Sequence, residues 1–134
     1  MVPVVVGALR GQNGVLAIEQ PELHVHPAIQ VGMGDLFIRA IKADTDGLPV
    51  AGKTLLIETH SEHILLRLLR RIREMTDGEL PPGVAGLSAK DLSVIYVEGG
   101  DEGVRFQPLC VDQGGEFLDQ WPQGFFEERA GELF

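Results

Sequence analysis

The sequence predicts an α/β fold in which helices flank a mostly parallel sheet and a β-hairpin follows in the C-terminal half. Two short strand-like runs, at 15–18 and 54–60, each lead into a segment with helical periodicity. Alternation of strands and helices across short links is typical of a parallel sheet. Two further strand-like runs flank a Gly-rich turn, which indicates the hairpin. A chain of 134 residues has the length of one domain.

The first strand is predicted at 15–18, where the uninterrupted apolar run VLAI follows an Asn-Gly turn. Such a run is typical of a strand that is buried on both faces. A helix is predicted to begin at Pro27, because proline suits the first turn of a helix, and to continue down to Gly47. Its apolar residues recur at steps of three and four, and we expect this face to be buried. The face consists of Ile29, Met33, Leu36, Phe37, Ala40 and Ile41.

The second strand is predicted within TLLIETH at 54–60, and a second helix follows it. Thr59 and Glu62 have the spacing of a capping box, with Thr59 as the cap. The buried face predicted for this helix consists of Leu65, Leu68, Leu69 and Ile72. The run LLRLLRRIRE is predicted to form a solvated face with Arg67, Arg70, Arg71 and Arg73.

The second half of the chain, 78–134, begins with a loop rich in proline and glycine. The runs SVIYVE and VRFQPLCV then flank GGDEG, and this pattern predicts a hairpin that adds an antiparallel edge. Cys110, in the second run, is predicted to be a structural thiol in an apolar strand. The charged tail that follows is predicted to dock Trp121, Phe125 and Phe126 onto the body of the same domain.

The formal net charge of −9 argues against a chain that coats nucleic acid by electrostatics, since neutralising phosphates needs an excess of Lys and Arg. Any nucleic-acid contact must therefore be local. The apolar start, MVPVVVGALR, is too short to cross a bilayer and lacks the basic leader of an export signal. A single cysteine cannot form an internal disulfide, which fits a reducing compartment. The sequence thus predicts a cytoplasmic protein without a membrane span.

The segment GLPVAGKT at 47–54 matches the phosphate-binding pattern G-x-x-x-x-G-K-[ST]. A working P-loop connects a strand to a helix whose N-terminus faces the phosphates. Here the segment follows a predicted helix and leads into a predicted strand, and Pro49 removes one backbone donor. We therefore interpret it as a helix-to-strand loop with a solvated Lys53.

All four histidines lie in two stretches, AIEQPELHVHP and IETHSEH, each of which includes the end of a predicted strand. The carboxyl ends of parallel strands form the ligand crevice of an open α/β sheet. We therefore expect the polar side chains of both stretches to converge there. They are Glu19, Gln20, Glu22, His24, His26, Glu58, His60 and His63.

Both stretches resemble motifs of one family. VLAIEQPELHVHP resembles the Walker B strand and D-loop of ABC-type ATPases of the RecF/OLD-like (AAA-domain) class, and LLIETHSEHILLRL resembles their switch-histidine segment. GEFLDQWPQGFFEE resembles the C-terminal extension of an uncharacterised bacterial subfamily, and MVPVVV resembles the start of the helix after the signature motif. The resemblance implies a P-loop NTPase-like half-domain that lacks the Walker A, Q-loop and signature regions.

The resemblance also implies roles for single residues. Glu19 takes the place of the Walker B acid that holds Mg²⁺, and a carboxylate is a ligand suited to that ion. His60 matches the switch histidine, which would contact the γ-phosphate of ATP. His24 and His26 fall in the D-loop, which reaches across an ATP-bound dimer in the family.

One position departs from the family pattern. Gln20 stands where such ATPases usually carry the catalytic glutamate, and an amide can orient a water but cannot take its proton. Glu22 is a nearby carboxylate that could replace the missing base. The sequence leaves open which of the two residues governs hydrolysis.

The resemblance therefore predicts that 1–77 is the Walker B, D-loop and switch-histidine lobe of an ATPase, with 78–134 packing on it. Mg²⁺ and ATP would bind only together with the missing N-terminal lobe, and the expected partners are that lobe or a second copy of the chain. One alternative is a zinc or manganese site, in which His24 and His26 combine with Glu19, Glu22 or His60. The other alternative is a non-catalytic interaction module.

Overall fold

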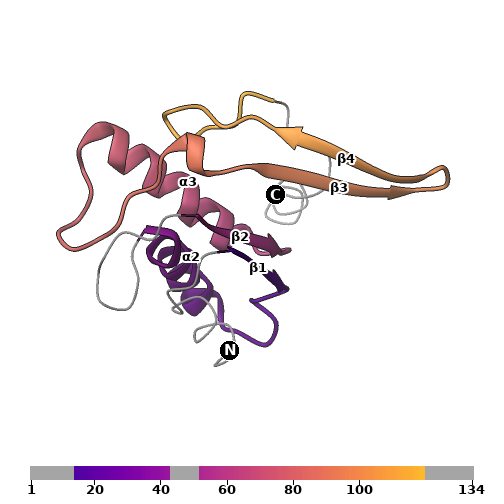
Figure 1. Cartoon of the computed structure of the whole chain (residues 1–134), viewed down its shortest axis with the longest axis horizontal. Helices are drawn as coiled ribbons and strands as arrows, with labels where there is room; N and C mark the ends of the chain where they lie inside the picture. The colour runs from indigo at the N-terminus through magenta and orange to yellow at the C-terminus, as the bar shows by residue number, and fades with distance from the viewer. Residues whose placement is uncertain (1–13, 43–51, 120–134) are drawn as a thin grey trace, which may run out of the picture.

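The computed structural model describes residues 14–42 and 52–119, which form two helices and four strands (Figure 1). Strand β1 (Gly14–Glu19) is followed by helix α2 (Pro27–Lys42), strand β2 (Lys53–Glu58) and helix α3 (Glu62–Asp77). A short 3-10 turn, η1 (Ala89–Asp91), then leads into strands β3 (Val94–Gly100) and β4 (Gly103–Leu109). Residues 1–13, 43–51 and 120–134 lie outside the described part. The expectations for MVPVVV, for the end of the first helix and for the aromatic tail therefore concern residues outside it.

The strands form two separate sheets of two strands each. Strands β1 and β2 are parallel, with register from Gly14 opposite Lys53 to Glu19 opposite Glu58. Strands β3 and β4 are antiparallel and form a hairpin that projects away from the helices (Figure 1). The predicted α/β class, the parallel strand pair and the C-terminal hairpin are thus confirmed.

The core lies between the two helices and one face of the β1–β2 sheet. Met33 and Phe37 of α2 and Ile64 of α3 form one buried cluster, against which Ile18 and Ile57 pack from the strands. Because a residue from each helix belongs to this cluster, both helices cover the same face of the sheet. Leu68 extends the core toward a second cluster, which consists of Ile38, Ile72 and Leu87.

The other face of the β1–β2 sheet is exposed, so the prediction that β1 and β2 are buried on both faces is wrong. Val15 on β1 is 72% exposed and Leu56 on β2 is 63% exposed. Burial alternates along both strands, because only the side chains that point toward the helices are covered. Parallel sheets are usually covered on both faces, so this face, which no described element covers, is unusual.

The two helices match most of the buried positions predicted for them. Met33, Phe37, Ala40, Leu69 and Ile72 are buried, whereas Leu36, Ile41, Leu65 and Leu68 are only half-buried. Ile29 is exposed, since it lies in the first turn of α2, before that helix reaches the core, and Ile38 is a buried residue that the periodicity missed.

Helix α3 is capped by Ser61 and not by the predicted Thr59. The Ser61 Oγ accepts a hydrogen bond from the Ile64 N–H at 3.2 Å. The Thr59 hydroxyl instead accepts from the Ser61 N–H at 3.0 Å, one step before the helix begins. Gly78 ends the helix in the left-handed conformation, with a φ of 72°.

The arginines of α3 form the predicted solvated face only in part, because Arg70 and Arg73 are exposed whereas Arg71 is buried. Arg71 is 4% exposed and binds Asp35 of α2 and Glu74 of its own helix. Arg70 also pairs with Glu74, and Arg67 lies 3.7 Å from the Asp35 carboxylate. Three of the four cations are therefore engaged inside the domain, which leaves little of this run for nucleic acid.

The hairpin carries an apolar face that solvent reaches. Residues directly opposite each other in an antiparallel pair share a face, so Ile95 with Pro108 and Val97 with Phe106 lie on one side. Phe106 is 70% exposed. The side chain of Cys110, just after β4, is exposed as well, because it alternates with the buried Leu109; the prediction of a structural thiol in an apolar strand is wrong.

Candidate functional site

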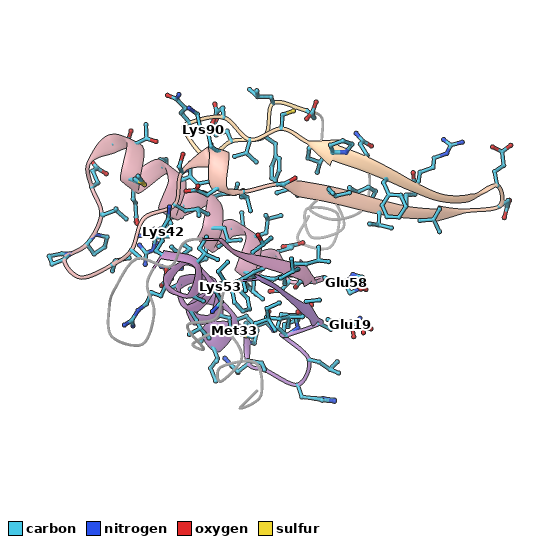
Figure 2. The ribbon with its side chains drawn as sticks, viewed as in Figure 1. Glu19, Met33, Lys42, Lys53, Glu58 and Lys90 are labelled. Carbon is cyan, nitrogen blue, oxygen red and sulfur yellow. The ribbon has the colours of Figure 1, made fainter. Side chains whose placement is uncertain are left out.

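The two parallel strands end at the same edge, with Glu19 and Glu58 directly opposite each other. Figure 2 shows both residues at one end of the strand pair. Both are exposed, and alternation places them on the bare face of the sheet together with Val15 and Leu56. Two neighbouring carboxylates therefore border an uncovered apolar surface.

The loop after β1 turns sharply at the sheet edge. The Gln20 N–H donates to the Glu58 carbonyl at 2.8 Å, which extends the pairing by one residue. Gln20 and His24 then adopt positive φ values of 43° and 60°, which non-glycine residues rarely do. Backbone strain of this kind persists only where surrounding contacts hold it, and it is often found at functional sites.

Glu22 connects this loop to the segment after β2. Its Oε1 accepts a hydrogen bond from the backbone N–H of His60 at 2.7 Å. Its Oε2 is buried and has no hydrogen-bond partner among the described residues. The two predicted site residues are therefore brought together, but the contact uses the backbone of His60 and leaves its imidazole available.

A second bridge lies beside the first. The Gln30 side chain donates through Nε2 to the Val25 carbonyl at 2.8 Å and accepts through Oε1 from the Ser61 hydroxyl at 2.6 Å. Since Ser61 caps α3, this bridge connects α2, the loop after β1 and the start of α3. Sequence reasoning missed Gln30, because its role depends on a residue beyond the second strand.

The side chains at this edge surround a hollow of about 650 Å³. The hollow contains five of the eight side chains that were expected to converge, whereas Glu19 and Glu58 lie on the adjoining sheet face and are not part of its wall. His63, in the first turn of α3, is also outside it. The walls are formed by Gln20, Glu22, Leu23, His24, Val25, His26, Gln30 and His60.

His26 begins the transition from the loop to α2. Its Nδ1 accepts a hydrogen bond from the Ala28 N–H at 3.2 Å. An acceptor nitrogen carries no proton, so this contact assigns the ring proton to Nε2 in the neutral imidazole.

The histidines and carboxylates do not form a transition-metal site in the described part of the chain. No three His, Cys, Asp or Glu side chains there are grouped so that they could hold a metal ion. Zinc sites need three or four such ligands. The structure therefore gives no support to the zinc or manganese alternative built on His24 and His26.

The end of the GLPVAGKT segment is strand and not helix. Lys53 and Thr54 are the first residues of β2, so no helix begins at the threonine as a P-loop requires. Lys53 is half-buried rather than solvated, and this burial lowers the pKa of its ammonium group. The residues at 43–51 lie outside the described part.

No family model, no curated protein and no solved structure matches this chain. Among the described residues, no helix is both long and apolar enough to cross a membrane. A function must therefore be argued from the geometry at the sheet edge and from the motifs in the sequence.

Proposed function

We propose that this chain is the C-terminal lobe of an ABC-type ATPase of the RecF/OLD-like class. It would contribute Mg²⁺ coordination and γ-phosphate sensing to a nucleotide held mainly by a separate N-terminal lobe. The observation that carries the proposal is the contact between Glu22 and His60 at the carboxyl ends of two adjacent parallel strands. It joins the D-loop-like and switch-like segments at the edge where open α/β sheets bind ligands.

The acidic residues at this edge fit Mg²⁺. That ion is bound by one or two protein carboxylates and completes its octahedron with waters and phosphate oxygens, so it does not need three protein ligands. Glu19 is the residue that would hold it, and Glu58, which is paired with Glu19 in the strand register, would offer a second carboxylate. When bound, Mg²⁺ would neutralise charge on the phosphates.

His60 is suited to contact a phosphate. Its backbone N–H is held by Glu22, which fixes the position of the residue while the imidazole lines the hollow. A ring nitrogen that carries a proton can donate to a phosphate oxygen.

Two residues are candidates for the base in hydrolysis, and they make different predictions. Gln20 can orient a water but cannot accept its proton. Glu22 retains one carboxylate oxygen without a partner among the described residues, so it could accept a proton after a small rearrangement.

The bare face of the β1–β2 sheet supports a missing lobe. An apolar face with side chains such as Val15 and Leu56 in water is usually covered by another element or chain. Pairing with an N-terminal lobe, or association of two copies, would remove this surface from solvent. Both partners are part of the proposal.

The experiment is to coexpress or fuse an N-terminal lobe that carries the Walker A, Q-loop and signature regions, and to measure ATP hydrolysis. We expect no turnover from the chain alone, slow turnover from the assembly, and loss of turnover in Glu19→Gln. If Gln20 occupies the base position, Gln20→Glu should accelerate single turnovers by about 10²–10⁴-fold. A rate unchanged by Gln20→Glu and abolished by Glu22→Gln would identify Glu22 as the base. An assembly that forms but never hydrolyses ATP would overturn the proposal.

A non-catalytic interaction module is the second candidate. The exposed apolar face of the hairpin, with Ile95, Val97 and Phe106, is the observation that favours it. Under this alternative a partner would bind the hairpin whether or not Glu19 and His60 were intact.

A further inference from the structure

Two side-chain bridges run in parallel between the loop after β1 and the segment after β2. One is the hydrogen bond from the His60 N–H to Glu22. The other passes through Gln30, which lies in the first turn of α2 and contacts both Val25 and Ser61.

Gln30 is chemically specific for this place. Its side-chain amide donates to a carbonyl through one atom and accepts from a hydroxyl through the other, at 2.8 and 2.6 Å. A carboxylate could only accept, an ammonium group could only donate, and an apolar side chain could do neither. Because Ser61 also accepts from the Ile64 N–H, the bridge continues into the backbone of α3.

The loop between the bridges needs such support. Gln20 and His24 both have positive φ, a conformation that relaxes unless neighbouring contacts hold it. Turn hydrogen bonds from the Leu23 N–H to Gln20 and from the Val25 N–H to Glu22 shape the loop internally. The side chains of Glu22 and Gln30 connect it to the segment after the second strand.

We propose that Gln30 is a positioning residue which, together with Glu22, joins the loop at 20–26 and the segment at 60–64 into one cooperative unit. A displacement of His60 is then passed to the loop that carries His24 and His26. The functional consequence rests on the proposed function. If His60 holds a phosphate, binding of that phosphate would be passed on to His24 and His26 in the D-loop-like segment. The structural coupling itself needs no nucleotide.

Native-state hydrogen exchange of the chain alone tests this coupling. Four amides report on the unit, and if it opens cooperatively they share one protection factor and one dependence on denaturant. They are the N–H groups of Leu23, Val25, His60 and Ile64. In Gln30→Ala we expect the exchange rates of Leu23 and Val25 to differ from those of His60 and Ile64 by about tenfold. A purely structural role would instead accelerate all four together.

Conservative variants sharpen the result. Glu22→Gln keeps an oxygen acceptor for the His60 N–H and should preserve the shared protection, whereas Glu22→Ala should split the four amides as Gln30→Ala does. Gln30→Glu keeps the acceptor for Ser61 but loses the donor to Val25, so we expect a smaller difference in exchange rate between the two pairs of amides. If Gln30→Ala does not fold, Gln30→Glu is the variant that decides. Arg39→Ala, at an exposed position on the same helix, is the control and should change nothing.

Two results would overturn the inference. One is four unrelated exchange rates in the unmodified chain, and the other is common protection that survives both Gln30→Ala and Glu22→Ala. Neither depends on ATP hydrolysis. If the amides behave as one unit while the assembled lobes fail to hydrolyse ATP, the coupling stands and the proposed function falls.

Discussion

The guanidinium of Arg71 binds the carboxylate of Asp35 through two nitrogens, with Nε to Oδ1 at 2.7 Å and Nη2 to Oδ2 at 3.1 Å. The pair connects the middle of α3 to the middle of α2, and Arg71 also donates to Glu74. The hydrogen bond to Asp35 is the main reason why the pKa of Arg71 is raised. This network fixes how the two helices sit on the sheet.

We expect Arg71→Leu to lower the free energy of unfolding by about 3 kcal/mol, because it leaves the carboxylates of Asp35 and Glu74 without their shared cation. Chemical denaturation monitored by circular dichroism measures the loss. Arg73→Ala, at an exposed position on the same helix, is the control and should change stability by less than about 0.5 kcal/mol. Equal effects of the two substitutions would show that the network contributes nothing specific.

Acid should weaken the same network through Glu74. Its hydrogen bonds to Arg70 and then to Arg71 hold the pKa of Glu74 below its ordinary value of 4.5. A carboxyl group with a lowered pKa in the folded state stabilises the protein above its unfolded pKa, and this contribution is lost as the pH falls through the folded pKa. We therefore expect the melting temperature to fall below about pH 4.5, and Glu74→Gln to flatten that dependence. An identical pH profile for Glu74→Gln would contradict the assignment.

Gly115 is predicted to be intolerant of any side chain. It has a φ of 71°, and a Cβ at this position would collide with the backbone carbonyl of Leu69 in α3. Gly115→Ala should destabilise the protein by more than about 2 kcal/mol. Gly83→Ala is the matched control, since Gly83 has a φ of 75° but open space around it, and its cost should be limited to about 1 kcal/mol. Thermal unfolding of both variants separates the collision from the backbone strain.

The chain alone should bind Mg-ATP weakly, with a dissociation constant above about 1 mM, because β2 begins at Lys53 and supplies no helix N-terminus for the phosphates. Isothermal titration calorimetry measures the affinity. Micromolar binding that disappears in Lys53→Ala would restore GLPVAGKT as a phosphate-binding loop.

The bare face of the β1–β2 sheet should make the chain self-associate at micromolar concentration. Leu56 lies on this face, so Leu56→Lys should shift the chain toward the monomer in multi-angle light scattering. Leu66→Lys is the control, because Leu66 is also exposed but belongs to α3. A monodisperse monomer before any substitution would remove the case for a homo-oligomer.

The element order was predictable because it follows from local patterns. VLAI and TLLI predict strands, and apolar residues at steps of three and four predict the helices. The convergence of Glu22 and His60 was predictable too, since parallel strands must end at the same edge.

Other features depend on contacts between distant residues and could not be predicted. Arg71 is buried because Asp35, 36 positions away, lies opposite it on α2, and a helical pattern alone cannot identify such a partner. An apolar run cannot show whether a strand is covered on one face or two, which is why the exposure of Leu56 was missed. The sequence also could not show that Ser61 and not Thr59 caps α3, because both residues have hydroxyls and both shortly precede the helix.

Pro108 makes the two edges of the hairpin unequal. It lies opposite Ile95 as the last residue but one of β4, and because proline has no N–H, the outer edge of β4 lacks a donor near its C-terminal end. Strand β3, VIYVEGG, contains no proline. An extended segment that pairs with this hairpin through its backbone would find a broken ladder beside β4 and a continuous one beside β3. Strand addition along the whole length of the hairpin is therefore favoured beside β3 and disfavoured beside β4.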